Sequence, residues 1–141
     1  MRKLFILITI ASTATLLSCR DQIYYTGDDV NCYECYTDTL ETGYLIIEFT
    51  LNDENVDVPI TVFSGQVDAS PIVFSAPCDT SALILEVPMN AYYSVKAAYK
   101  NGNDSIYVVD GGRLEAKLVT GICDVDCWVV QGGEYNVSLT Y

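Results

Sequence analysis

The alternation of apolar and polar residues with a period of two is the feature that most constrains the fold of this chain. From residue 43 to the C-terminus, short stretches of this kind are separated by turn-forming residues. In residues 43–51, for example, Leu45, Ile47 and Phe49 occupy every second position. Successive side chains of a β-strand point to opposite faces of a sheet, so each stretch predicts a strand with one buried face.

The same pattern predicts further strands at 58–64, 82–87, 93–100, 106–109, 114–118, 127–130 and 134–141. Asn101-Gly102 predicts a hairpin turn, because both residues tolerate the positive φ that a two-residue hairpin needs. The glycine pairs at 111–112 and 132–133 predict two more turns. About seven to nine short strands without a long helical period favour an all-β fold, a single antiparallel β-sandwich over residues 42–141.

The N-terminus has the three parts of a secretion signal. Arg2 and Lys3 form a positive region, residues 4–17 carry no charge, and Leu16-Leu17-Ser18-Cys19 follows. The apolar stretch has the length of a signal-peptide core and is shorter than a membrane-spanning helix. With Leu at −3, Ser at −1 and Cys at +1, this segment resembles the precursors of bacterial lipoproteins.

The resemblance implies that residues 1–18 are a cleaved signal peptide, that Cys19 is acylated, and that 19–41 tether the domain to the membrane. Arg20 stands where an aspartate would resemble the inner-membrane retention signal, so we expect the outer membrane, on its periplasmic or its cell-surface face. Arg20-Asp21 is similar to the surface-export signals of Bacteroidetes lipoproteins.

The charge of the chain limits its partners and its chemistry. The 141 residues include 7 basic and 19 acidic side chains and no histidine. Removal of residues 1–18 takes away Arg2 and Lys3, so the formal net charge of the remaining chain is 5 − 19 = −14. Such a charge repels phosphate backbones, so we expect no nucleic-acid partner. Without histidine there is no Ser-His or Cys-His nucleophile pair and no histidine-ligated zinc. We assign no catalytic residue and expect no cofactor.

Five cysteines remain after the acylated one. In an oxidising envelope, disulfides are the usual fate of cysteines. Cys32 and Cys35 precede the first strand, and Cys123 and Cys127 flank the start of a late one, so these four are the disulfide candidates, with three connectivities open. Cys78 is the candidate free thiol. One alternative is a zinc site with these four thiolates as ligands. The other is a redox-active thiol pair at Cys32 and Cys35, which have CxxC spacing.

Two short resemblances bear on the domain. The stretch from Leu85 through Pro88 to Tyr92-Tyr93 resembles the strand–turn–strand of transthyretin-like and carboxypeptidase-regulatory-like domains, which implies a sandwich of that kind. Asp38-Thr39-Leu40 and Asp104-Ser105-Ile106 resemble the O-glycosylation acceptor of Bacteroidetes, which implies Thr39 and Ser105 as acceptor sites.

Acidic and aromatic residues supply the remaining candidates. Residues 52–57 carry three acids and two asparagines without the spacing of a calcium-binding EF-hand, so we expect a solvated loop and no metal. Eleven tyrosines and Trp128 could form a stacking face for sugars or a protein-binding face, or be ordinary strand residues.

Together these features predict a non-enzymatic, lipid-anchored envelope protein that acts as a binding or structural accessory module. Its expected partners are the membrane, through the lipid, and an envelope protein or glycan. The alternative is a periplasmic metal- or thiol-based protein that uses Cys32/Cys35 and Cys123/Cys127.

Overall fold

The computed structural model describes residues 32–120 and 123–140. These ranges contain eight strands: β1 (Thr42–Glu48), β2 (Val58–Phe63), β3 (Ile72–Cys78), β4 (Ala82–Pro88), β5 (Ala91–Asn101), β6 (Asp104–Val119), β7 (Cys127–Gln131) and β8 (Glu134–Asn136). Within the same ranges, no helix has the length and apolar character needed to cross a membrane.

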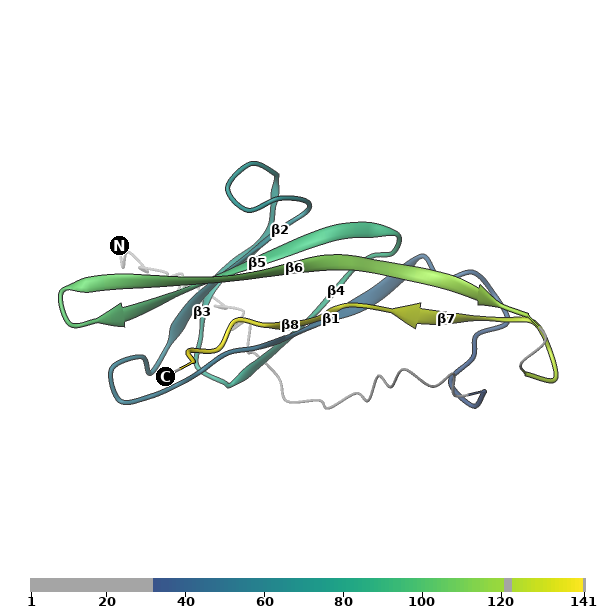
Figure 1. Ribbon diagram of the computed structural model, residues 1–141, viewed down its shortest axis with the longest axis horizontal. Helices are drawn as coiled ribbons and strands as arrows, with labels where there is room; N and C mark the ends of the chain where they lie inside the picture. Colours follow the sequence, from purple (N-terminus) through teal and green to yellow (C-terminus); the bar gives the residue numbers. More distant parts are fainter. Residues whose placement is uncertain (1–31, 121–122, 141) are drawn as a thin grey trace, which may run out of the picture.

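The strands form two sheets, one of three strands in the order β4-β1-β8 and one of five in the order β3-β2-β5-β6-β7. The two sheets face each other along the long axis of the molecule, and the β5–β6 hairpin is the longest element (Figure 1). The predicted all-β sandwich is therefore confirmed. One pairing differs from a purely antiparallel fold, since β8 runs parallel to β1 from the pair Ile46–Glu134 onward.

The core lies between the sheets and follows the alternation of the sequence. Its fully or almost fully buried side chains are Leu45, Ile47, Phe49, Val58, Ile60, Val62, Cys78, Leu83, Val87, Met89, Tyr93, Val95, Ala97, Tyr99, Leu114, Tyr135 and Val137. Burial of each large apolar side chain stabilises the fold by roughly 1.5–3 kcal/mol. The period of two thus determines which face of each strand joins the core.

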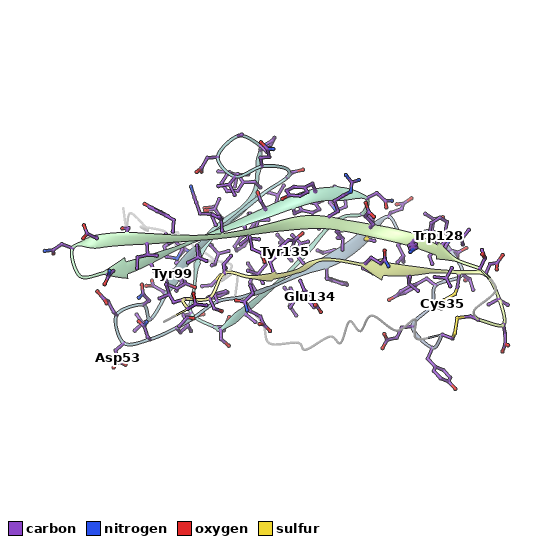
Figure 2. The ribbon with its side chains drawn as sticks, in the orientation of Figure 1. Cys35, Asp53, Tyr99, Trp128, Glu134 and Tyr135 are labelled. Atoms are coloured by element: carbon purple, nitrogen blue, oxygen red, sulfur yellow. A yellow bond between two sulfur atoms is a disulfide. The ribbon has the colours of Figure 1, made fainter. Side chains whose placement is uncertain are left out.

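Buried tyrosines link the two sheets by hydrogen bonds. The hydroxyl of Tyr99 on β5 donates to the carbonyl of Val137 at 2.7 Å and accepts from the backbone N–H of Thr50 at 3.1 Å (Figure 2). The hydroxyl of Tyr93 donates to the carbonyl of Pro88 at 2.8 Å. Since an unpaired buried hydroxyl is costly, these bonds fix the positions of the rings as well as filling space.

The turn predicted at residues 110–112 is wrong. The strand β6 runs through this segment without a break, and Gly111 and Gly112 pair with Ser94 and Tyr93 of β5. A Cβ atom on Gly111 would lie 2.8 Å from the hydroxyl oxygen of Tyr92. The glycine at position 111 therefore gives a tyrosine room to lie against the strand, which is a packing role and not a turn.

Two more strands differ from the prediction. The strand β3 was not predicted, because it lies at a sheet edge where Ile72 and Val73 are exposed and the apolar–polar alternation is lost. The last strand was predicted over 134–141, and β8 covers only Glu134–Asn136. After Asn136 the chain still bonds to β1, since the N–H of Val137 donates to the carbonyl of Glu48 at 2.9 Å.

Candidate functional site

The four candidate cysteines meet at one end of the molecule in two disulfides. Cys32 is joined to Cys123 and Cys35 to Cys127, with Cα–Cα distances of 5.6 and 5.4 Å. This is one of the three connectivities left open by the sequence. The Sγ atoms of Cys35 and Cys123, which belong to different disulfides, lie 4.0 Å apart, and Figure 2 shows Cys35 at this end, near Trp128.

Backbone hydrogen bonds hold the same segment in place. Tyr36 and Trp128 form an antiparallel bridge outside the named strands. The N–H of Tyr36 donates to the carbonyl of Trp128 at 2.9 Å, and the reverse bond measures 2.7 Å. The chain that leads into the domain is thus attached to the β7 end by two covalent links and a backbone pair. We call this assembly of residues 32–36 and 123–128 the cysteine clamp.

The clamp also satisfies the proximity that a metal site would need. The Sγ atoms of Cys35, Cys123 and Cys127 all lie within 4.8 Å of one another. In the disulfide state these sulfurs are not thiolates, and zinc binds the thiolate form. Reduction of both bonds would therefore convert the clamp from a covalent link into a candidate set of four thiolate ligands.

The remaining predicted site residues lie apart from the clamp. Cys78 ends β3, is buried, and belongs to neither disulfide. Thr39 and Ser105 are both exposed, the former before β1 and the latter on β6, near the β5–β6 turn. Cys19, with the predicted signal peptide and most of the predicted tether, lies outside the described residues.

The acidic loop at 52–57 is held by a buried asparagine. The side chain of Asn55 is 3% exposed. Its amide oxygen accepts from the N–H of Lys100 at 2.6 Å, and its amide nitrogen donates to the carbonyl of Lys100 at 3.2 Å. The side chain therefore pairs with the end of β5 much as a neighbouring strand would. Its role in this loop is to attach the loop to the β5–β6 hairpin.

The outward face of β5 and β6 gathers the basic residues of the chain. Of the seven basic residues, Arg2, Lys3 and Arg20 precede residue 32, and the other four lie on these two strands. Antiparallel register places paired residues on one face, and the face opposite the core carries Tyr92 with Arg113 and Lys96 with Val109. We call this face the outer strip; its large side chains are Tyr92, Lys96, Lys100, Tyr107, Val109, Arg113, Glu115 and Lys117.

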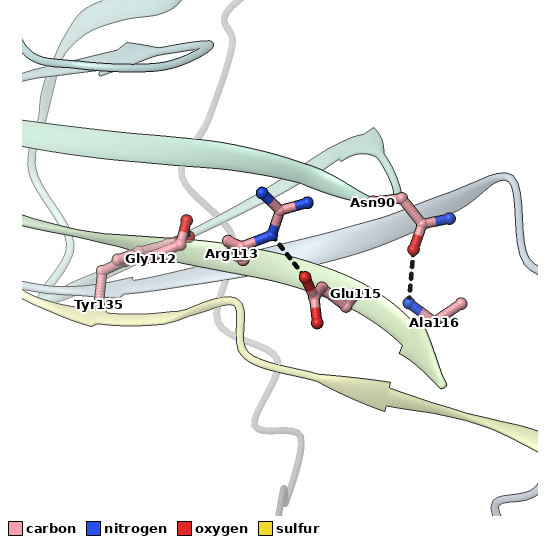
Figure 3. A network of polar contacts seen from close by, with 6 residues as sticks. All are labelled: Asn90, Gly112, Arg113, Glu115, Ala116 and Tyr135. Atoms are coloured by element: carbon pink, nitrogen blue, oxygen red, sulfur yellow. Dashed lines mark hydrogen bonds and ion pairs between the residues drawn. The ribbon is translucent and has the colours of Figure 1, made fainter. Parts of the chain in front are cut away.

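Aromatic rings and two acids surround these cations. The ammonium group of Lys96 lies 5.7 Å from the ring centres of Phe63 and of Tyr107 and forms an ion pair with Asp68. The guanidinium of Arg113 pairs with Glu115 two residues further along β6 (Figure 3). These are the only ion pairs within residues 32–120 and 123–140, so Lys100 and Lys117 stay without an ion-pair partner there.

Two hydrogen bonds at the edge of the sandwich join β6 to β8. The hydroxyl of Tyr135 donates to the carbonyl of Gly112 at 3.1 Å, and Asp110 accepts from the N–H of Asn136 at 2.8 Å. Burial, reinforced by the Asp110 carboxylate, raises the pKa of Tyr135 to about 12. The phenol is therefore neutral at physiological pH and serves as a hydrogen-bond donor between the strands.

Sequence reasoning identified the cysteines and the tyrosines and missed the gathering of the cations. The signal was present, because Asn101-Gly102 fixes the hairpin register and the four cations occupy positions of one parity along each strand. Comparison of the chain with protein-family models, with curated proteins and with solved structures gives no match.

Proposed function

We propose that this protein is a non-enzymatic, lipid-anchored module of the bacterial outer membrane that binds an envelope partner through the outer strip. The observation that carries the proposal is the placement of all four basic residues of the described ranges, with exposed Tyr92 and Tyr107, on one face of a strongly acidic chain. Charges and exposed rings hold a partner by contact, and rings that combine apolar area with a polar tip are common in binding faces.

The position of the strip within the sheet supports side-chain recognition. The strand β5 lies between β2 and β6, and β6 lies between β5 and β7. The segment of β5 from Ser94 to Ala97 is paired with β2 on one side and with β6 on the other, so no strand can be added there. The strand β6 pairs with β5 over residues 104–114 and with β7 over residues 115–119. A partner that lies on the face of these strands contacts their outward side chains. We assign no catalytic group to this face.

The anchor is the second part of the proposal. Acylation of Cys19 would place the lipid 13 residues before Cys32, the first cysteine of the clamp. A chain of that length reaches at most about 45 Å. The domain would therefore stay close to the membrane, with the clamp as the point where the tether joins it.

The test of binding is co-sedimentation of the detergent-extracted protein with detergent-insoluble envelope fragments. We expect the Tyr92→Ala/Tyr107→Ala variant to bind about ten-fold or more weakly, since each ring contributes roughly 0.5–1.5 kcal/mol beyond its buried area. Tyr44→Ala removes a similarly exposed tyrosine from the other sheet and should leave binding unchanged. Equal binding by all three proteins would contradict the proposal.

The second candidate function, a metal- or thiol-based protein, is favoured by one observation, the mutual proximity of three Sγ atoms in the clamp. Intact mass of the envelope-extracted protein, native and denatured and with thiol alkylation, separates the two. An acylated Cys19, two disulfides and one thiol alkylated only after denaturation (the buried Cys78) agree with the proposed module. Four more alkylated thiols, together with a zinc mass that is lost on denaturation, would favour the metal protein.

A further inference from the structure

We infer that the ligand of the outer strip is an acidic polysaccharide, a linear chain of uronic acid sugars. This inference rests on the proposed function and narrows it to a chemical class. It draws on three properties of the strip: its charge against that of the rest of the molecule, its shape, and the fixed positions of its rings.

The charge distribution favours an anionic ligand of narrow cross-section. All but three of the 19 acidic residues lie in the described ranges, and Asp21, Asp28 and Asp29 are the exceptions. Two of the acids in the described ranges lie at the strip itself, where Glu115 pairs with Arg113 and Asp68 pairs with Lys96. A bulky acidic partner would bring its charges near many more carboxylates, whereas a linear chain can follow the line of cations. At physiological salt, charges more than about 8 Å away are largely screened, so local contacts decide the interaction.

The shape of the strip suits an extended chain. Toward its ends it is two strands wide, which is roughly 10 Å at the spacing of strands in a sheet. In the middle, the 64–71 loop covers the β5 side at Ser94, which is 3% exposed, so the strip follows β6 there. From Ser105 to Lys117 it extends along β6 for about 40 Å at the rise of a β-strand. Lys100 and Lys117, the two cations without an ion-pair partner in the described ranges, lie toward opposite ends of this length. Several successive sugars could thus contact the strip together.

The rings of Tyr92 and Tyr107 are exposed, and contacts with neighbouring residues limit their movement. The side chains of Tyr92 and Tyr107 are 42% and 62% exposed. Tyr107 lies beside the ammonium group of Lys96, which is itself held between two rings and paired with Asp68. The hydroxyl oxygen of Tyr92 lies over Gly111, 2.8 Å from the position that a Cβ atom would take there. Pre-positioned aromatic faces reduce the entropy lost on binding, and each sugar offers an apolar face for them and a carboxylate for the cations.

The experiment measures binding of oligogalacturonate to the detergent-extracted full protein by calorimetry. We expect binding that weakens as salt is raised. The fully methyl-esterified oligomer has the same sugar rings without the charges and should bind about ten-fold or more weakly. Neutral dextran oligomers should show no binding.

Variants test whether the strip is the site. Lys100→Glu/Lys117→Glu reverses the two cations without an ion-pair partner and should weaken oligogalacturonate binding about ten-fold or more, as should Tyr107→Ala. Tyr44→Ala is the control on the other sheet and should bind as the unaltered chain does. Circular dichroism establishes that each variant is folded. Binding that ignores esterification, or that survives the double charge reversal, would overturn the inference.

Two further ligands discriminate between sources of negative charge. Vesicles with anionic phospholipid and a single-stranded oligothymidylate present phosphates in place of carboxylates. Neutral vesicles measure the binding that the lipid anchor alone supplies. Binding to anionic vesicles beyond that level, or to oligothymidylate, that is tighter than binding to oligogalacturonate would also overturn the inference. The inference can fail while the proposed function stands. If oligogalacturonate does not bind but envelope co-sedimentation still depends on Tyr92 and Tyr107, the strip is a binding face for another ligand. If neither assay depends on these rings, both proposals fail.

Discussion

The fold strongly affects the ionisation of Tyr135. It is almost completely buried, its hydroxyl bonds to the carbonyl of Gly112, and the carboxylate of Asp110 lies close enough to act on it. Burial and this negative charge both disfavour the phenolate, so the pKa rises to about 12 from an ordinary value of 10.0. The pKa of Tyr93 is raised as well, through burial.

A raised pKa for Tyr135 predicts loss of stability in alkali. Because the folded pKa exceeds the unfolded one, the contribution is fully present below pH 10 and is lost as the pH rises from about 10 to about 12. The size is roughly 3 kcal/mol. Urea unfolding at a series of pH values should show this decline, and Tyr135→Phe, although less stable at neutral pH, should show a smaller one. A decline of the same size in the Phe variant would contradict the assignment.

Asn55 provides the second prediction for a single residue. Asn55→Ala removes both bonds to the backbone of Lys100 and should lower the free energy of unfolding by about 1–3 kcal/mol. Asp53→Ala, in the same loop but with an exposed side chain, is the control and should change it by less than about 0.5 kcal/mol. Chemical denaturation of the two variants compares them directly. Equal effects would mean that the loop gains nothing from the buried amide.

At the level of elements, the sequence predicts strands well where one face joins the core. The residues Tyr93, Val95, Ala97 and Tyr99 alternate in the sequence and are all buried in β5. The prediction failed where another demand replaced that alternation. At Gly111 the hydroxyl of Tyr92 lies over the strand, and in β3 the edge position leaves Ile72 and Val73 exposed. Neither the contact at the glycine nor the edge position of β3 can be predicted from the sequence of one strand, since both depend on the neighbouring strands.

In the candidate site, too, the sequence predicts the local features and misses those that depend on contacts between distant segments. The four cysteines of the clamp could be selected from sequence, from their spacing and from the oxidising compartment that the N-terminus predicts. Their connectivity depends on the meeting of two segments some 90 residues apart, which only the sheet order provides. Phe63 belongs to the outward side of β2 and is nevertheless buried, because the 64–71 loop covers that face; Ser94 donates to Gly65 in this loop at 2.6 Å. No local sequence pattern predicts that a loop covers this face of β2.

The clamp predicts that its two disulfides stabilise the fold in a non-additive way. Either one closes a loop of some 90 residues and by chain entropy contributes about 4–5 kcal/mol. Once one is present, the other closes only a short ring through residues 32–35 and 123–127. Its loss should then cost only about 2–3 kcal/mol. Removal of both should cost about 7 kcal/mol, more than the two separate losses together.

Thermal unfolding of Cys32→Ser/Cys123→Ser, of Cys35→Ser/Cys127→Ser and of the quadruple variant measures this coupling. We expect each paired variant to lose about 10 °C in melting temperature and the quadruple variant nearly three times as much. Replacing cysteines in pairs avoids a free thiol beside the remaining disulfide. Strictly additive losses would show that the two bonds constrain the unfolded chain independently.

At the scale of the whole molecule, the clamp and the β5–β6 turn occupy opposite ends of the long axis (Figure 1). The strand β6 connects these ends over 16 residues, about 50 Å at the rise of a strand. The outer strip follows this strand. If the lipid is attached at Cys19, the tether joins the domain at the clamp, and the strip extends away from the membrane toward the turn.

This arrangement predicts the orientation of the anchored protein. A fluorophore at Val125, in the loop between the clamp cysteines, should be quenched by quencher-labelled lipid headgroups more than one at Asn103, in the β5–β6 turn. A third label at Val56, in the loop that Asn55 attaches to the same end as the turn, should behave like the one at Asn103. The measurement uses the acylated protein in liposomes. Equal quenching at all three positions would mean that the molecule lies flat on the bilayer with its strip along the lipid, and an acidic polysaccharide would then have to compete with the membrane for the same four cations.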